Sequence, residues 1–128
     1  MRRFVLLLAP LLAVGCSAAE AVSPELACQR RLAAAREAQP AQGDDFNHQA
    51  YAKLDQTGCT AKQLAVLDQI LVLTTALPGL TQANNIIGMT GDKAGHSAAF
   101  QKMNDSVIEL NALEQSIRSD LTQMEQSK

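Results

Sequence analysis

A stripe of apolar side chains late in the chain, spaced alternately three and four residues apart, restricts this part to a long amphipathic helix. Seven of its eight positions are apolar, and the eight are Phe100, Met103, Val107, Leu110, Glu114, Ile117, Leu121 and Met124. The flanks carry Asn, Ser and Gln rather than matched charges, which favours antiparallel packing within a bundle and leaves a homodimer open. We expect this helix to begin between Asp92 and Ser97, with the Glu114 carboxylate in water at the edge of the stripe.

Two earlier helices are predicted from their end signals. Ser23-Pro24 is typical of a helix start, because serine caps the helix and proline fits its first position. We expect this helix to run to about Gln39, where a following proline discourages continuation. A second helix is expected to begin at Asp44 or Asp45 and to end at Gly58.

A third helix is predicted from Thr60, because Thr60-Ala61-Lys62-Gln63 has the spacing of a capping box. Two apolar stripes follow, one of Leu64, Leu67 and Leu71 and the other of Val66, Ile70, Leu73 and Leu77. Two stripes predict burial on a wide face, as in the central helix of a bundle. Pro78-Gly79 is expected to break or sharply bend this helix.

The first residues have the order of a secretory signal: a positive start, an apolar core and then small residues. Arg2 and Arg3 supply the charge, and the apolar run over 4–12 is too short to cross a bilayer. We expect residues 1–15 to be a cleaved signal peptide, with a buried N-terminal helix as the alternative. The protein is therefore expected to be exported.

The stretch Ala13-Val14-Gly15-Cys16 resembles the lipobox of bacterial lipoproteins, with alanine where leucine is usual. The resemblance implies that Cys16 becomes the first mature residue and carries lipid, so that residues 16–23 form a short tether to the membrane. Ser17 after the cysteine resembles outer-membrane sorting, with the protein facing the periplasm. The alternative is an ordinary signal-peptidase site at Ser17-Ala18-Ala19 or Ala19-Glu20-Ala21, which gives a soluble periplasmic or secreted protein.

The other two cysteines, Cys28 and Cys59, predict one disulfide in an exported protein, with two unpaired buried thiols as the alternative. Ala, Leu, Gln and Glu are common, and aromatic residues make up only 3% of the chain, which favours helix over strand. The sequence therefore predicts an all-α fold over residues 24–128. We expect a small antiparallel bundle of four to five helices stapled by this disulfide.

The segment Gln69–Gly91 contains no charged residue, and Pro, Gly and two Asn interrupt its apolar run. These interruptions argue against a transmembrane helix. One interpretation is a short helix and a flexible loop packed on the domain. The other is a mobile, uncharged contact surface for a partner, and its candidate residues are Leu80, Ile86, Ile87 and Met89.

The charge of the chain argues against a nucleic-acid partner. Loss of Arg2 and Arg3 lowers the 11 Lys and Arg to nine against 13 Asp and Glu, a net charge of about −4. The chain also lacks Trp and a basic patch. We expect contact with a membrane through lipid on Cys16, and contact with an envelope protein whose identity the sequence does not give.

Catalytic motifs of the GxSxG, P-loop, HExxH and GxGxxG types do not occur, so we name no catalytic residue, cofactor or metal. His48 and His96 are the only histidines, and the simplest interpretation of each is a surface side chain. A weak divalent-metal site at Asp44, Asp45 and His48 is the alternative, because Asp44 and His48 share one helix face.

The sequence thus predicts no enzyme, but a protein with a binding or structural role, such as an accessory or inhibitor of an envelope protein. Two stretches resemble the LTxxQ motif that envelope-stress periplasmic chaperones carry twice, and they are Leu80-Thr81-Gln82-Ala83-Asn84 and Leu121-Thr122-Gln123-Met124-Glu125-Gln126. The first ends in Asn, and the second places its Gln one residue late. This resemblance implies a chaperone-like function as the alternative.

Overall fold

The computed structural model describes residues 22–127, and these residues form four helices and no strand. In chain order, the helices are α2 (Pro24–Glu37), α3 (His48–Ala52), α4 (Ala61–Gly88) and α5 (Lys93–Gln126). The prediction of a small all-α bundle with one disulfide is confirmed. The expected signal peptide, Cys16 and the tether up to residue 21 lie outside the described residues.

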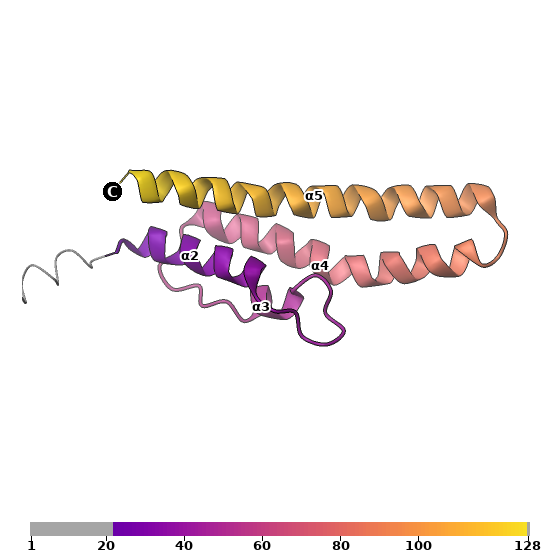
Figure 1. Cartoon of the computed structure of the whole chain (residues 1–128), viewed down its shortest axis with the longest axis horizontal. Helices are drawn as coiled ribbons and strands as arrows, with labels where there is room; N and C mark the ends of the chain where they lie inside the picture. The colour runs from indigo at the N-terminus through magenta and orange to yellow at the C-terminus, as the bar shows by residue number, and fades with distance from the viewer. Residues whose placement is uncertain (1–21, 128) are drawn as a thin grey trace, which may run out of the picture.

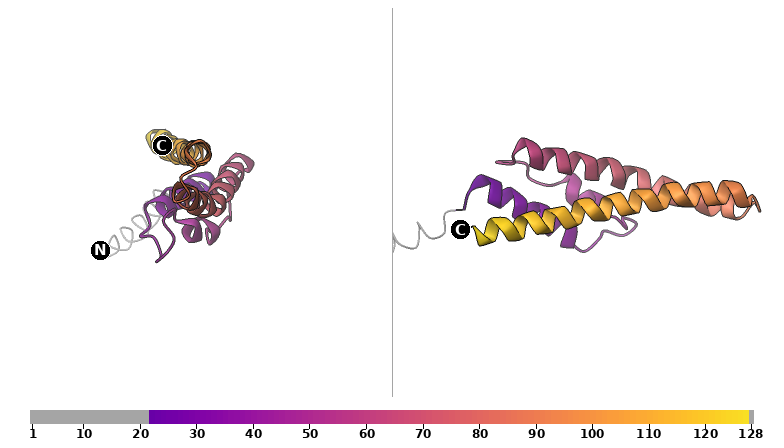
Figure 2. Two further views of the ribbon diagram at one scale, coloured as in Figure 1. Left: turned by 90° about the vertical axis from the view of Figure 1, so that its right-hand side faces the viewer. Right: turned by 90° about the horizontal axis from the view of Figure 1, so that it is seen from above.

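A long antiparallel hairpin of α4 and α5 forms the body of the molecule (Figure 1). The 34 residues of α5 span about 50 Å at the usual helical rise. The helices α2 and α3 lie beside only one half of this hairpin, next to both ends of the described chain (Figure 1). The half that contains the turn extends beyond them, as the perpendicular views also show (Figure 2).

The predicted disulfide joins α2 to the corner before α4, with 2.06 Å between the Cys28 and Cys59 sulfurs. Cys28 is completely buried. Gly58, which precedes Cys59 in the chain, has a φ of 77°, and a Cβ there would lie 2.8 Å from the Cβ of Pro24. Glycine is therefore required where this corner passes the first turn of α2.

The predicted second helix is much shorter than expected, because α3 ends at Ala52 and the chain reaches Gly58 as a loop. The side chain of Arg31 binds this loop, donating hydrogen bonds to the carbonyls of Asp55 at 2.8 Å and Thr57 at 2.5 Å. These two carbonyls therefore accept hydrogen bonds from a side chain of α2. In a longer α3 they would have accepted hydrogen bonds from backbone N–H groups of the same helix. The loop has the extra reach that brings Cys59 to Cys28.

Of the two outcomes expected at Pro78, a break or a sharp bend, the break is wrong, because α4 continues through this residue to Gly88. Proline removes one helical hydrogen bond, at a cost of about 3 kcal/mol in a helix interior. Leu77 is fully buried, and Leu80 packs on the core one turn later, so burial on both sides of the proline holds the helix together. Figure 1 shows a change of direction in the axis of α4 near its middle, so a bend, the other expectation, is what accompanies the proline.

The core lies where α2 and α3 meet the hairpin. Its buried residues come from all four helices, and they are Cys28, Leu32, Ala35, Tyr51, Leu67, Ile70, Leu73, Leu77, Leu110 and Ile117. The predicted stripe of α5 faces inward, although Phe100, near the turn, is half exposed. Asp92 caps α5 by accepting a hydrogen bond from the Gly95 N–H, within the range predicted for the helix start.

Removal of the disulfide should lower the free energy of unfolding by about 3 to 4 kcal/mol, because the bond closes a long loop in the unfolded chain. Urea unfolding of a Cys28→Ala/Cys59→Ala variant measures this loss. Reduction of the native protein should lower its stability by a similar amount. An unchanged midpoint after complete reduction would contradict the expectation.

Candidate functional site

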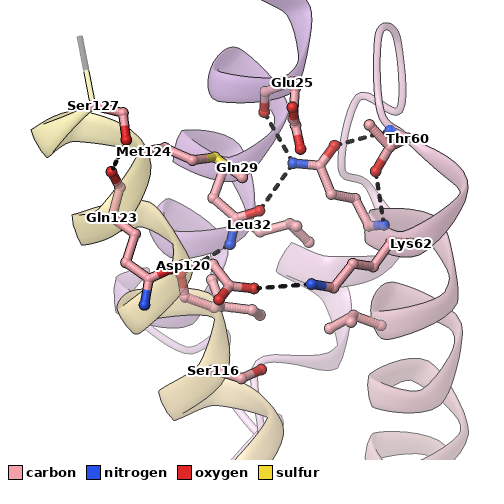
Figure 3. Close-up of a pocket in the computed structure, with 13 residues that line it drawn as sticks. Glu25, Gln29, Leu32, Thr60, Lys62, Ser116, Asp120, Gln123, Met124 and Ser127 are labelled. Atoms are coloured by element: carbon pink, nitrogen blue, oxygen red, sulfur yellow. Dashed lines mark hydrogen bonds and ion pairs between the residues drawn. The ribbon is translucent and has the colours of Figure 1, made fainter.

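A groove of about 450 Å³ opens between α2, α4 and α5, at the end where the described chain begins and ends (Figure 3). Leu32, Val66 and Ile117 give it an apolar lining. Lys62 and Asp120 face each other across it, with 3.9 Å between the Lys Nζ and the Asp Oδ2. Lys62 is highly exposed, so this ion pair contributes little to stability.

Two glutamine side chains join the three helices around this groove. The Gln63 amide donates to the Gln29 Oε1 and to the Glu25 carbonyl, both at 2.9 Å. The Gln29 amide in turn donates to the Ile117 carbonyl at 2.9 Å. Gln63 also completes the predicted capping box, since its Oε1 accepts from the Thr60 N–H. These amides are engaged in structural hydrogen bonds rather than presented to a ligand.

A partly buried hydrogen bond connects α3 to α5, where the Tyr51 hydroxyl donates to the Glu114 Oε2 at 2.6 Å. The expectation that Glu114 keeps its carboxylate in water is wrong, because its side chain is only 13% exposed. Arg36 lies 3.8 Å from the other carboxylate oxygen. Burial raises the pKa of Tyr51, and the Glu114 carboxylate raises it further, so Tyr51 stays a hydrogen-bond donor.

His48 is half-buried, with its Nδ1 2.7 Å from the Thr74 Oγ1 on α4. Asp44 accepts hydrogen bonds from the backbone N–H groups of His48 and Gln49. Burial raises the pKa of Asp44, but these hydrogen bonds outweigh it and hold the pKa below its usual value. The Asp44 carboxylate thus caps the start of α3. For the alternative of a metal site, no group of three or more potential metal ligands occurs within residues 22–127.

The predicted contact surface lies on the part of α4 after Pro78, up to and including its C-cap, in the half of the hairpin that contains the turn and is called the free half below. Its four residues divide between two environments. Leu80 and Ile87 are half-buried, and Leu80 packs against the core. Ile86 and Met89 are 52% and 82% exposed. The interpretation of a short helix and a flexible loop is wrong, because the segment is regular helix as far as Gly88.

By length and composition alone, α4 meets the requirement for a membrane-crossing helix, with a mean hydropathy of 1.6 in its most apolar window. The core helix of a soluble protein can meet the same requirement, although only 22% of this window is buried in the protein.

The two LTxxQ-like stretches lie on different helices. The second lies on α5 beside α2, where Glu125 pairs with Arg30, while the first lies on α4 after Pro78.

Comparison with protein-family models, with characterised proteins and with solved structures finds no match. The fold alone therefore defines the class, which is a disulfide-stapled all-α domain built on a long hairpin. Within the described residues, the polar clusters at Gln63, Tyr51 and His48 hold helices together. The exposed apolar side chains on the free half of the hairpin are the feature that such structural roles leave unexplained.

The raised pKa of Tyr51 should make stability fall as the pH rises above about 10, the ordinary tyrosine pKa. Below that pH the phenol is protonated in both states, and its contribution is fully present. Above it, the unfolded chain ionises first, so the contribution is lost as the pH rises toward the folded pKa. Urea unfolding at a series of pH values measures this slope.

Tyr51→Phe is the control for this prediction, because it removes only the hydroxyl. It should lower the stability at neutral pH by about 1 to 3 kcal/mol, since it leaves a half-buried carboxylate without its donor. It should also lack the tyrosine part of the alkaline slope. Tyr51 is the only tyrosine in the chain, so phenolate absorbance reports its ionisation directly. The same alkaline slope in both proteins would contradict the assignment.

Proposed function

We propose that the protein is an exported, lipid-anchored helical protein of the bacterial envelope that binds a partner protein through the free half of its hairpin. The observation that carries the proposal is the exposure of Met89 and Ile86 on a segment, Gln69–Gly91, that contains no charge. Exposed apolar patches on small proteins are typical of interaction sites. The role is binding rather than catalysis.

The shape of the molecule supports this arrangement of anchor and contact surface. The described chain begins at the end of the molecule opposite the hairpin turn (Figure 1). A lipid on Cys16 would hold that end near a membrane through the eight-residue tether 16–23, which reaches at most about 28 Å when extended. The turn is about 50 Å away along α5, so it can meet a partner beyond the lipid headgroups.

The proposed location is the periplasmic face of the outer membrane, and it rests on the lipobox-like residues and on Ser17 after Cys16. We expect the intact mass of the mature protein to equal the chain from Cys16 with lipid attached. Mass spectrometry of the protein from the producing bacterium measures this. An unlipidated chain beginning near Val22 would contradict the anchor and would make the protein soluble in the periplasm or the medium.

Replacing Met89 with Asp should weaken partner binding at least tenfold, because it places a charge in the apolar contact. The matched control is Ile108→Asp on α5, another exposed apolar residue, at 58%, outside the uncharged segment. Both side chains point to solvent, so both variants should fold. A photo-crosslinker at position 89 identifies the partner in the cell, and titration with the purified partner gives the affinity.

Equal affinities of the native protein and the Met89→Asp variant would rule out the hairpin end as the contact surface. A chaperone-like activity would give a different result. The protein would then suppress the aggregation of several unrelated clients, and the crosslinker would capture many proteins instead of one.

A further inference from the structure

The outward face of α4 carries a regular stripe of exposed small and apolar residues, opposite the side that forms the core. Its members are spaced alternately four and three residues apart, and they are Val72, Ala76, Gly79, Ala83 and Ile86. All five are exposed, and Val72 is 68% exposed. This spacing keeps the five residues on one line along the helix, as in the seam of a helix pair.

The stripe is symmetric about its centre. Val72 and Ile86 lie seven residues on either side of Gly79, and Ala76 and Ala83 lie three and four residues from it. The order of sizes is therefore large, small, smallest, small, large in both directions. A surface with this symmetry is complementary to itself when a second copy is turned by a two-fold rotation, which is the rule for a dimer of identical chains.

The centre of the stripe is open enough for a close approach by another helix. A Cβ at Gly79 would meet no atom within 4 Å, so neither packing nor a positive φ explains glycine inside this helix. Glycine in a helix interior costs up to about 1 kcal/mol relative to alanine. Close packing of a second helix against Gly79 would explain the glycine, because small residues allow two helix backbones to approach each other.

The charges of α4 also favour a second copy. In an antiparallel pair centred on Gly79, the stretch from Gln69 to Met89 meets itself, and it contains no charge. Between the two copies of this stretch, no charge is buried and no like charges oppose each other. Exposed Thr75 and Gln82 flank the stripe and can hydrogen-bond across the pair. Such polar flanks suit a protein interface better than the hydrocarbon of a bilayer.

We propose that two copies of this chain associate through the outward faces of α4, antiparallel about a two-fold axis at Gly79. Val72 packs against the partner's Ile86, and Ile86 packs against the partner's Val72. The dimer and the proposed function share Ile86, but they are tested separately, since Gly79 belongs only to the stripe and Met89 lies outside it. The two helices overlap over about 30 Å. One helix from each chain makes a smaller contact than a standard interface of about 1,600 Å², so the dimer is weak and concentration dependent.

The Gly79→Leu variant distinguishes an effect on dimerisation from an effect on the folding stability of the monomer. Leucine favours helix and meets no clash here, so the unfolding midpoint should be unchanged or raised. The same side chain blocks the close approach, so dimerisation should be lost. The matched control is Ala112→Leu, at an exposed position of α5 outside the stripe, which should leave the dimer intact. Sedimentation equilibrium of the protein as matured by the cell, in density-matched nonionic detergent, measures association.

A charge exchange tests the antiparallel register. Val72→Lys and Ile86→Glu should each weaken self-association at least tenfold, because each places two unpaired charges in the interface. A 1:1 mixture should restore dimers, since one lysine then faces the glutamate of the other chain while the native Val72 and Ile86 meet at the other contact. A parallel pair would bring position 72 against position 72, and mixing would not restore the dimer.

Three results would overturn the proposal. The first is a native protein that stays monomeric at millimolar concentration. The second is a dimer that Gly79→Leu leaves intact, or that mixing the charged variants does not restore. The third is a monomer in which lipids brominated in their acyl chains quench a fluorophore attached at Ala76→Cys, because the stripe would then contact the bilayer.

Discussion

Three helices meet at one buried side chain, and the position of α2 depends on it. Gln63 begins α4 as part of its capping box, binds the first turn of α2 through the Glu25 carbonyl, and reaches α5 through Gln29. α2 has only 14 residues, and an isolated helix of this length is marginal in water. The amide network and the Cys28–Cys59 bond together hold this helix on the hairpin, and through it they hold the loop that contains α3.

The same arrangement makes the two halves of the molecule unequal. At the base, all four helices contribute to the core, and a disulfide adds to the packing. Toward the turn, α4 and α5 contact mainly each other (Figure 1), apart from the loop at Gly43, Asp45 and Phe46 that lines a pocket with the part of α4 after Leu77. Asn84 is buried there with an Oδ1 that has no hydrogen-bond partner, which is costly inside a protein. Local opening should therefore begin on the free half, where the apolar side chains are also the most exposed.

The sequence predicted the features that depend on a few neighbouring residues. Ser23, Thr60 and Asp92 each cap a helix. The even number of cysteines left in a chain expected to be exported indicated the bond between Cys28 and Cys59. The errors arose where tertiary contacts outweigh local preference. α4 passes through Pro78 because Leu77 and Leu80 are packed, and no local signal reports the strength of that packing.

The contact of Glu114 with Tyr51 shows why the polar clusters were missed. The periodicity of α5 placed Glu114 among core positions, and water was the only partner that the sequence offered for its charge. Its partner belongs to α3, a five-residue helix whose place depends on a loop held by Arg31. For the same reason, the capping box located Gln63 but not its contacts with α2. A charged or amide residue inside an apolar stripe is better treated as a sign of an unknown partner.

The outward face of α4 differs from an ordinary solvent-exposed helix face, because it carries no charge from Gln69 onward. A helix with one face in the core usually carries charges on the other, since they keep the protein soluble. In α4 the inward face has leucine and isoleucine, while the outward face from Gln69 to Gly88 has no charge at all. The neighbouring α5 carries ordinary surface charges, such as Lys102, Asp105 and Glu109. The lack of charge is therefore specific to α4, and a face that remains in contact with a second helix explains it better than composition does.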